Sequence, residues 1–328
     1  MEQTAHPELL SVMIPAFHSE HRLRPAVAAL AGRLEAEQIP FEILIIDDGS
    51  KDHTWAVAQQ LAKEDARVRA FRLSRNYTSP YVHFAGFSVC KGACVTSMPD
   101  DLQRPLDTLV ACYRKWQEGH KLVVSYRVSR DDGWWSDLFS GLYYRIMNSL
   151  SDVSFPPGGT DGFLADREIV DIMNTRIHPI HTSTVVEVLR LGFDPVFIPY
   201  DRPPRQGKSR WTWKKKVRLA KDTFFASSSF PIRAITSLGL GISIICLLAI
   251  PLLTYARFFA HSRLFGFQVP GWTTIIALVA FFNGLMLFCL GIVAEYIWRI
   301  YEEVKARPGF IIRKEGPVTT EKTEIPGN

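Results

Sequence analysis

The chain has 328 residues, 47% of them hydrophobic, and a formal net charge of +5. This length accommodates one sizeable soluble domain and a smaller module, and so modest a charge gives no argument for nucleic acid as a partner. Most of the basic excess lies between Arg202 and Arg233, beside the apolar part of the chain, which indicates anionic lipid or phosphate instead.

The leading part of the chain alternates strand-like and helix-like segments. This alternation predicts an α/β domain with a mostly parallel sheet covered by helices on both faces. The N-terminus has no apolar signal core and the five cysteines have no metal-site spacing, so we expect a reduced domain on the cytoplasmic side. The predicted strands are residues 10–16, 41–46, 68–73, 93–98 and 122–126, and the predicted helices are 23–37, 54–65, 81–91 and 106–119.

Two acidic turns follow predicted strands of this sheet. Asp47 and Asp48 end the second strand, and Asp100, Asp101 and Gln103 follow the fourth. Ligands of such sheets bind beyond the carboxyl ends of the strands, so both turns should lie at the binding edge. Carboxylates and an amide there suit Mg²⁺ or Mn²⁺ holding a diphosphate, although an acidic pair at a strand end is often a plain turn.

Two apolar stretches, residues 235–258 and 273–298, are each long enough to span a membrane. Lysine and arginine are concentrated before the first stretch and after the second, which places both termini in the cytoplasm. A buried helical hairpin is the alternative.

Residues 211–225 mix aromatic and basic side chains and predict an interfacial helix, with a solvated basic helix as the alternative. We expect the tail after Pro308 to be disordered.

Familiar phosphate-binding motifs are absent. No glycine-rich dinucleotide fingerprint follows the first strand. Gly207-Lys208-Ser209 resembles the end of a phosphate-binding P-loop, but Arg202 stands where that motif needs its first glycine. The remaining cations able to grip phosphate oxygens are on predicted loops: Arg127, Arg130, Arg202, Arg205, Lys208 and Arg210.

Several motifs, in order along nearly the whole chain, together resemble one family. They are residues 14–17 (IPAF), 46–54 (IDDGSKDHT), 73–76 (LSRN), 101–105 (DLQRP), 143–148 (YYRIMN), 161–163 (DGF), 205–210 (RQGKSR) and 301–308 (YEEVKARP). The chain resembles the family 2 glycosyltransferases that use a polyprenyl-phosphate acceptor. This group includes the bacterial undecaprenyl-phosphate sugar transferases and the dolichyl-phosphate mannose synthases.

The resemblance implies a GT-A fold, with a Rossmann-like and mostly parallel sheet, followed by interfacial helices and two transmembrane helices. It implies transfer of one sugar from a nucleotide donor to a polyprenyl phosphate at the cytoplasmic face of the inner membrane, by a multi-pass protein that forms a homo-oligomer. The implied sites are a nucleotide pocket of Pro15, Phe17, Asp47 and Asp48, a metal site of Asp101 and Gln103 for Mg²⁺ or Mn²⁺, and phosphate-binding Arg127, Arg130, Arg205 and Arg210.

The expected chemistry is an in-line displacement with inversion. A phosphate monoester is largely anionic at neutral pH, so the acceptor needs orientation more than it needs a base. The harder step is departure of the nucleoside diphosphate, whose charge a metal at Asp101 and Gln103 would stabilise. Asp161 is the candidate should a base be used, and a turn residue otherwise.

Three departures from the family pattern stand out. The family usually has an acidic residue where this chain has Pro99, and Asp100 is expected to point elsewhere. His18-Ser19 replaces the usual Asn-Glu, and residues 77–84 replace the usual Phe-Gly run. A non-catalytic scaffold that binds nucleotide sugar or lipid phosphate is therefore the alternative function; a processive synthase is disfavoured because two spans make a poor polymer channel.

The expected domain boundaries follow from these assignments. Residues 1–205 form the catalytic domain and 206–232 the basic interfacial region. Residues 233–300 form the transmembrane hairpin, and 301–328 a partly disordered cytoplasmic tail.

Overall fold

The computed structural model describes residues 6–128, 156, 160–179, 183–201, 235–242, 244, 248, 263–264, 267–268, 271–305 and 307–316. The chain divides into two compact units. The first unit comprises Met1–Ser227 and Pro308–Asn328, and the second comprises Ser228–Arg307.

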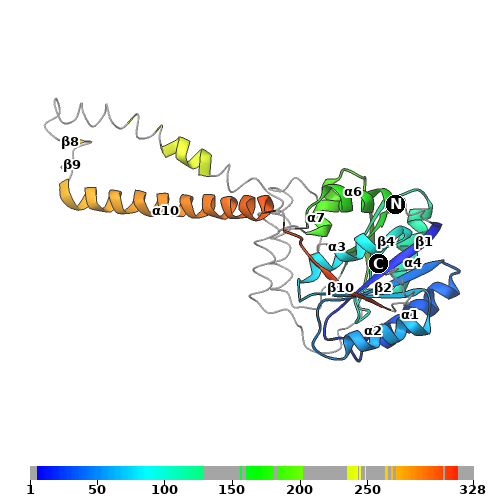
Figure 1. Ribbon diagram of the computed structural model, residues 1–328. Helices are drawn as coiled ribbons and strands as arrows, with labels where there is room; N and C mark the ends of the chain where they lie inside the picture. Colours follow the sequence, from blue (N-terminus) through cyan, green and yellow to red (C-terminus); the bar gives the residue numbers. More distant parts are fainter. Residues whose placement is uncertain are drawn as a thin grey trace, which may run out of the picture. The chain divides into compact units, whose positions relative to one another are not determined.

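The first unit is built on an eight-stranded sheet with the strand order β10-β3-β2-β1-β4-β6-β5-β7 (Figure 1). The central strands β3, β2, β1 and β4 pair in parallel, whereas β6 runs antiparallel to both of its neighbours. The strands are β1 His6–Ala16, β2 Phe41–Asp47, β3 Val68–Leu73, β4 Gly92–Ser97, β5 Leu122–Arg127, β6 Thr160–Asp166, β7 Val196–Tyr200 and β10 Ile312–Gly316.

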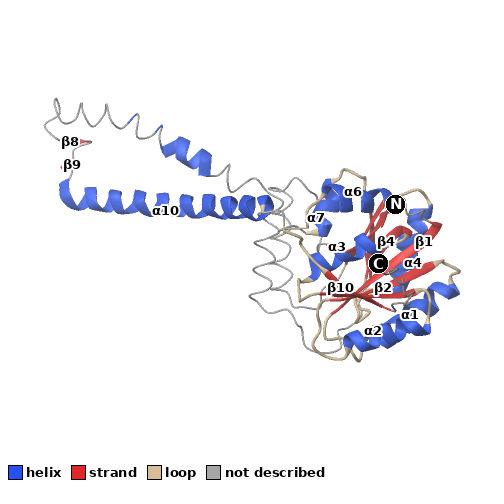
Figure 2. Ribbon diagram, viewed as in Figure 1, coloured by secondary structure: helices blue, strands red, loops and turns tan. Residues whose placement is uncertain are grey.

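Helices cover both faces of this sheet, as Figure 2 shows. Side chains from α1, α2 and α4 form one hydrophobic core on one face, and side chains from α3, α6 and α7 form a second core on the other. Every residue of β2 is buried, because a strand covered on both faces has no polar side to present. The helices are α1 Leu23–Ala36, α2 Thr54–Glu64, α3 Ser79–Val89, α4 Leu106–Gln117, α6 Arg167–Arg176 and α7 Thr184–Arg190.

The predicted α/β class and mostly parallel sheet are confirmed. All five predicted strands and all four predicted helices are present, and their ends differ from the predicted ones by a few residues. The sequence did not predict β6, β7, α6 or α7. Strand β6 inserts between β4 and β5, and its start, Thr160-Asp161-Gly162, has the composition of a turn rather than of a strand.

The C-terminal tail differs from its prediction. Residues after Pro308 were expected to be disordered, yet Ile312–Gly316 form β10, which pairs antiparallel with β3 at the edge of the sheet. In Figure 1 this strand, labelled β10, lies beside the blue strands of the N-terminal part. The prediction is wrong for these five residues because pairing with β3, which is distant in the sequence, outweighs their polar composition.

The second unit contains one long helix, α10, which runs over Gly271–Val304. Within the described residues, its segment Phe281–Tyr301 is the one stretch long and apolar enough to cross a membrane. Residues 235–242 are helical, but most of the first predicted span lies outside the described residues, as does the predicted interfacial region 206–232. The two-span prediction is therefore not confirmed. The unit also holds a short hairpin of β8 Arg263–Leu264 and β9 Phe267–Gln268.

Candidate active site at the carboxyl ends of the strands

Three turns meet at one edge of the sheet. Ala16, the last residue of β1, pairs with Asp47, the last residue of β2, and the Asp48 N–H donates to the Ala16 carbonyl at 2.9 Å. On the other side of β1, the Met98 N–H donates to the Met13 carbonyl at 2.8 Å. The segments after β1, β2 and β4 therefore leave the sheet side by side, as the sequence predicted for the two acidic turns.

Asp47 is completely buried and is held by its own turn and by β3. Its Oδ1 accepts a hydrogen bond from the Ser50 N–H at 3.0 Å, and its Oδ2 lies 3.1 Å from Arg72 Nε. Burial raises the pKa of this carboxyl group, and the Ser50 hydrogen bond and the Arg72 charge oppose that rise. Asp47 thus orders the turn 47–50.

Asp48 holds the loop that follows β3. Its Oδ1 accepts from the Tyr77 N–H at 2.7 Å and its Oδ2 accepts from the Thr78 N–H at 3.0 Å. Burial raises the pKa of Asp48 against these two hydrogen bonds. Gly49, at φ +68°, permits the close approach, because a Cβ there would lie 2.6 Å from the Arg75 carbonyl carbon.

The acidic turn after β4 separates its two carboxylates. Asp100 accepts a hydrogen bond from the Ser19 hydroxyl and lies 2.8 Å from an Arg22 guanidinium nitrogen. Asp101 is exposed, and its Oδ1 accepts from the Gln103 N–H at 3.3 Å. These contacts tie Asp100 to the segment between β1 and α1, and the expectation that it does not serve the metal stays a prediction.

The oxygen atoms of Asp101 and Gln103 fit a hard divalent cation. Gln103 is 8% exposed, and its buried Oε1 has no hydrogen-bond partner among the described residues. A buried amide oxygen is costly without a partner, and a cation would supply one. No group of three or more His, Cys, Asp or Glu side chains that could hold a metal exists in the described part of the chain, so a cation here would rely on these two residues, solvent and substrate.

Arg104 is a buried residue next to the acidic turn, and the sequence analysis gave it no role. It is 2% exposed and donates from Nη2 to the Ser97 carbonyl at 2.6 Å and to the Thr96 hydroxyl at 3.2 Å. Gly162 of β6 packs directly against its guanidinium, where a Cβ would overlap. Ser97 also meets His83 of α3, whose Nε2 lies 3.1 Å from the Ser97 hydroxyl. The sequence signal was present: Arg104 lies within the family motif and His83 within a departure from it.

The other predicted site residues are brought together only in part. Pro15 pairs with Ile46 in the sheet, and Phe17, 38% exposed, stacks obliquely on His18 with ring centroids 4.3 Å apart. Arg127 is the last residue of β5 and is half-buried. Asp161 lies in β6, and Arg130, Arg205 and Arg210 lie outside the described residues.

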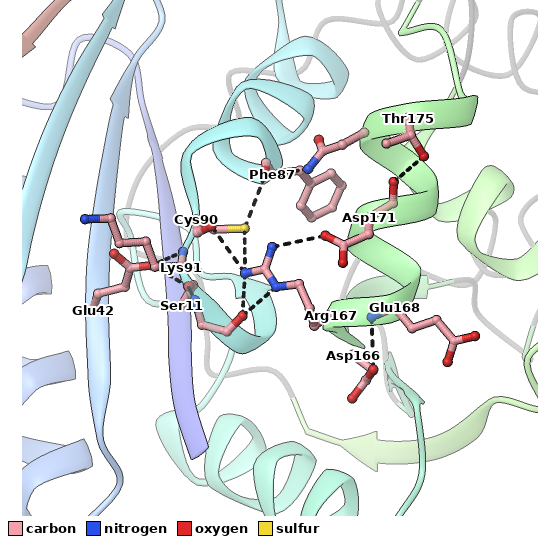
Figure 3. Close-up of polar contacts among 12 residues, drawn as sticks. Ser11, Glu42, Phe87, Cys90, Lys91, Asp166, Arg167, Glu168, Asp171 and Thr175 are labelled. Atoms are coloured by element: carbon pink, nitrogen blue, oxygen red, sulfur yellow. Dashed lines mark hydrogen bonds and ion pairs between the residues drawn. The ribbon is translucent and has the colours of Figure 1, made fainter. Parts of the chain in front are cut away.

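A buried polar network fixes the opposite ends of the central strands (Figure 3). Arg167 donates from Nε to the Gly92 carbonyl at 2.9 Å and from Nη2 to the Cys90 carbonyl at 3.2 Å. Glu42 Oε1 accepts from the Ser11 hydroxyl and from the Lys91 N–H, both at 2.6 Å. Burial raises the pKa of the Cys90 thiol to about 11, so this cysteine is an unreactive part of the network.

A mostly parallel α/β sheet with acidic turns at its carboxyl ends is an architecture in which enzymes bind ligands at that edge, and comparison with known proteins identifies the family. Residues 11–171 match the model of glycosyl transferase family 2. An uncharacterized glycosyltransferase of Synechocystis sp. is 32% identical over 307 residues, covering 92% of this chain and 94% of that protein. The chain therefore belongs to glycosyl transferase family 2, and the protein is a glycosyltransferase.

Two further relatives match over a similar length, and the name of one of them specifies a bactoprenol acceptor. The SfII prophage-derived bactoprenol glucosyl transferase of Shigella flexneri is 29% identical over 308 residues, covering 93% of this chain and 97% of the relative. The putative glycosyltransferase CsbB of Bacillus subtilis is 28% identical over 307 residues, covering 93% and 92% of the two chains. Because the chain belongs to a family of enzymes, a non-catalytic scaffold that binds nucleotide sugar or lipid phosphate is disfavoured.

Proposed function

We propose that this glycosyltransferase transfers one sugar from a nucleotide-sugar donor to a polyprenyl phosphate at the cytoplasmic face of a membrane. The observation that carries the acceptor assignment is the extent of similarity to bactoprenol glucosyl transferases. It covers 93% of this chain and so includes the region of α10, which has the length and apolarity to span a membrane. Multi-pass topology and a homo-oligomer belong to the same proposal.

The donor would bind beside the turns after β1, β2 and β4. Phe17 offers an exposed ring to the base, and Asp47 and Asp48 shape the wall formed by the turn 47–50 and the loop after β3. Asp101 and Gln103 would hold Mg²⁺ or Mn²⁺. When bound, such an ion supplies positive charge that stabilises the departing nucleoside diphosphate.

The acceptor phosphate would be bound by a set of arginines. Arg127, at the end of β5, is the described member of this set, and Arg130, Arg205 and Arg210 are the others proposed. The phosphate oxygen is anionic at neutral pH and attacks the anomeric carbon directly, with inversion. Asp161 is the residue to examine should the reaction need a base.

A transfer assay tests this function. Purified full-length protein is mixed with undecaprenyl phosphate, Mn²⁺ or Mg²⁺, and a panel of radiolabelled UDP- and GDP-sugars. We expect label to enter the organic phase with one donor, and to stop doing so when EDTA removes the ion. The same reaction without undecaprenyl phosphate is the control for hydrolysis of the donor.

Two results would contradict the proposal in different ways. Transfer that persists fully in EDTA would exclude the metal at Asp101 and Gln103. Absence of transfer with every donor, in protein that binds UDP or GDP, would exclude the acceptor assignment and redirect the search to other acceptors.

A further inference from the structure

The chain that follows α10 returns to the catalytic sheet as a segment we call the C-terminal strap, residues 309–316. Gly309 packs so closely on the rest of the unit that a Cβ there would lie 2.6 Å from Pro179 Cγ and 3.2 Å from Tyr81 Cδ1. Phe310 and Ile312 pack on the hydrophobic core under α3 and α6. The strap is therefore an integral part of this unit.

The strap ends its pairing at the loop that borders the donor site. Strand β10 pairs with β3 up to Leu73, and the next N–H, that of Ser74, donates to the Ile311 carbonyl at 2.9 Å. The Ser74 hydroxyl lies 2.8 Å from the Tyr77 hydroxyl. Ser74 thus contacts the strap through its N–H and Tyr77 through its hydroxyl, so a shift of the strap would also shift Tyr77.

The other side of this loop is held by Asp48. The N–H groups of Tyr77 and Thr78 donate to the two carboxylate oxygens of Asp48. Thr78 adopts φ 77° and ψ 165°, a conformation that residues other than glycine adopt only when their surroundings enforce it. The loop 74–78 is therefore fixed from two sides, by Asp48 at the donor site and by the strap at the sheet edge.

We propose that the C-terminal strap is a positioning element of the donor site, which sets the loop 74–78 so that Asp48 and its turn present a formed nucleotide pocket. The inference rests on the proposed function for the identity of the ligand, a nucleoside diphosphate. The strap follows the candidate membrane helix and lies more than two hundred positions after the pocket residues in the sequence. The proposal therefore assigns to residues 309–316 a role in binding the donor.

The test substitutes Gly309→Val in the full-length protein and measures binding of UDP and GDP with Mn²⁺ by calorimetry. The valine side chain must displace Pro179 or Tyr81, so it shifts the strap. We expect the dissociation constant of the nucleotide, and the donor KM, to rise about tenfold, while the KM for undecaprenyl phosphate stays unchanged. Gly32→Val on α1 is the matched control, because a Cβ there meets nothing within 4 Å. Gly309→Ala replaces the valine variant if the latter fails to fold.

Amide hydrogen exchange supplies a readout that does not depend on turnover. In Gly309→Val, exchange at Ser74, Tyr77 and Thr78 should accelerate, because their N–H groups lose ordered acceptors. By reciprocity, nucleotide binding to the unmodified protein should slow exchange within β10. Faster loop exchange with unchanged nucleotide affinity would overturn the proposal, as would unchanged exchange in a folded variant.

The outcome that contradicts the proposed function can be distinguished from the outcome that contradicts the role of the strap. If the unmodified protein binds UDP and GDP but transfers no sugar, the binding and exchange measurements still decide the role of the strap. If it binds neither nucleotide, the ligand assignment is wrong and the positioning proposal falls with it.

Discussion

At the residue scale, the two neighbouring carboxylates of the turn after β4 have different environments and should respond differently to removal. Asp101 is exposed and accepts a hydrogen bond from the Gln103 N–H, whereas Asp100 accepts from the Ser19 hydroxyl and pairs with Arg22. We expect Asp101→Ala to lower metal-dependent transfer by about 10²–10³-fold, since it would remove a ligand of the proposed metal ion that stabilises the leaving diphosphate.

Asp100→Ala is the matched control for that prediction. It should retain most of the transfer activity but lose about 1–2 kcal/mol of stability, because Ser19 and Arg22 lose their partner. Steady-state transfer and thermal unfolding of both variants check this. Equal losses of metal-dependent activity in the two variants would mean that Asp100 also binds the metal.

The Asp48–Thr78 contact gives a second prediction at this scale. Thr78 is held in a backbone conformation that costs about 1–3 kcal/mol for a residue with a side chain. Asp48→Asn should destabilise the protein by about 1–3 kcal/mol, because an amide cannot accept both N–H groups. Thr78→Gly should be neutral or stabilising, and in the double variant it should recover part of the loss.

Unfolding midpoints of the two single variants and the double variant measure this coupling. Strict additivity of the two changes would show that Asp48 does not hold the loop through Thr78.

At the element scale, β6 supports the acidic turn through Arg104. Gly162→Ala should push the Arg104 guanidinium off the Ser97 carbonyl and the Thr96 hydroxyl, because no room exists for a Cβ. Overpacking of this kind costs about 1–3 kcal/mol, and the shifted turn should lower transfer activity more than tenfold. Thermal unfolding and transfer rates measure both effects, with Gly32→Ala as the control. Unaltered activity in a destabilised variant would show that Arg104 supports the fold without positioning the turn.

Elements whose formation depends on their own side chains could be predicted from the sequence. The run Phe41–Asp47 is apolar except for Glu42 and Asp47 and is bounded by turn residues, so a buried strand was evident. Strands β6 and β10 could not be predicted in this way, because partners far along the chain fix them: β4 and β5 for the first, β3 for the second.

The candidate site shows the same division. Asp101 and Gln103 could be recognised from their spacing in a motif. The engagement of Asp48 with Tyr77 and Thr78, and of Arg104 with Gly162, joins residues 29 or more positions apart and has no local signal. Such long-range contacts determine whether an acidic side chain faces the ligand or holds a loop. They form only when the chain folds, so the local sequence does not predict them.

At the scale of the whole molecule, the side chains near the end of α10 indicate where a membrane boundary would lie. Glu295 pairs with Arg299 at 3.3 Å, and the Lys305 ammonium lies 4.0 Å from the centroid of the Tyr301 ring. Charged pairs and aromatic–cation contacts are typical of the interface rather than of the hydrocarbon core. With lysine and arginine concentrated after this point, the C-terminal end of α10 is expected on the cytoplasmic side.

This orientation predicts that the β8–β9 hairpin lies on the opposite side of the membrane from the catalytic unit. Leu264→Cys should react with a membrane-impermeant maleimide in intact cells, whereas Gly32→Cys, on the exposed side of α1, should react only after permeabilisation. The unmodified protein is the control for labelling of the native cysteines, of which Cys90, Cys94 and Cys112 are buried and Cys289 lies within α10. Labelling of both variants only after permeabilisation would contradict a membrane-crossing α10 and favour a helix that associates with the membrane from one side. Labelling of Gly32→Cys alone in intact cells would show the opposite topology. The donor site would then lie outside the cytoplasm, away from the supply of nucleotide sugars.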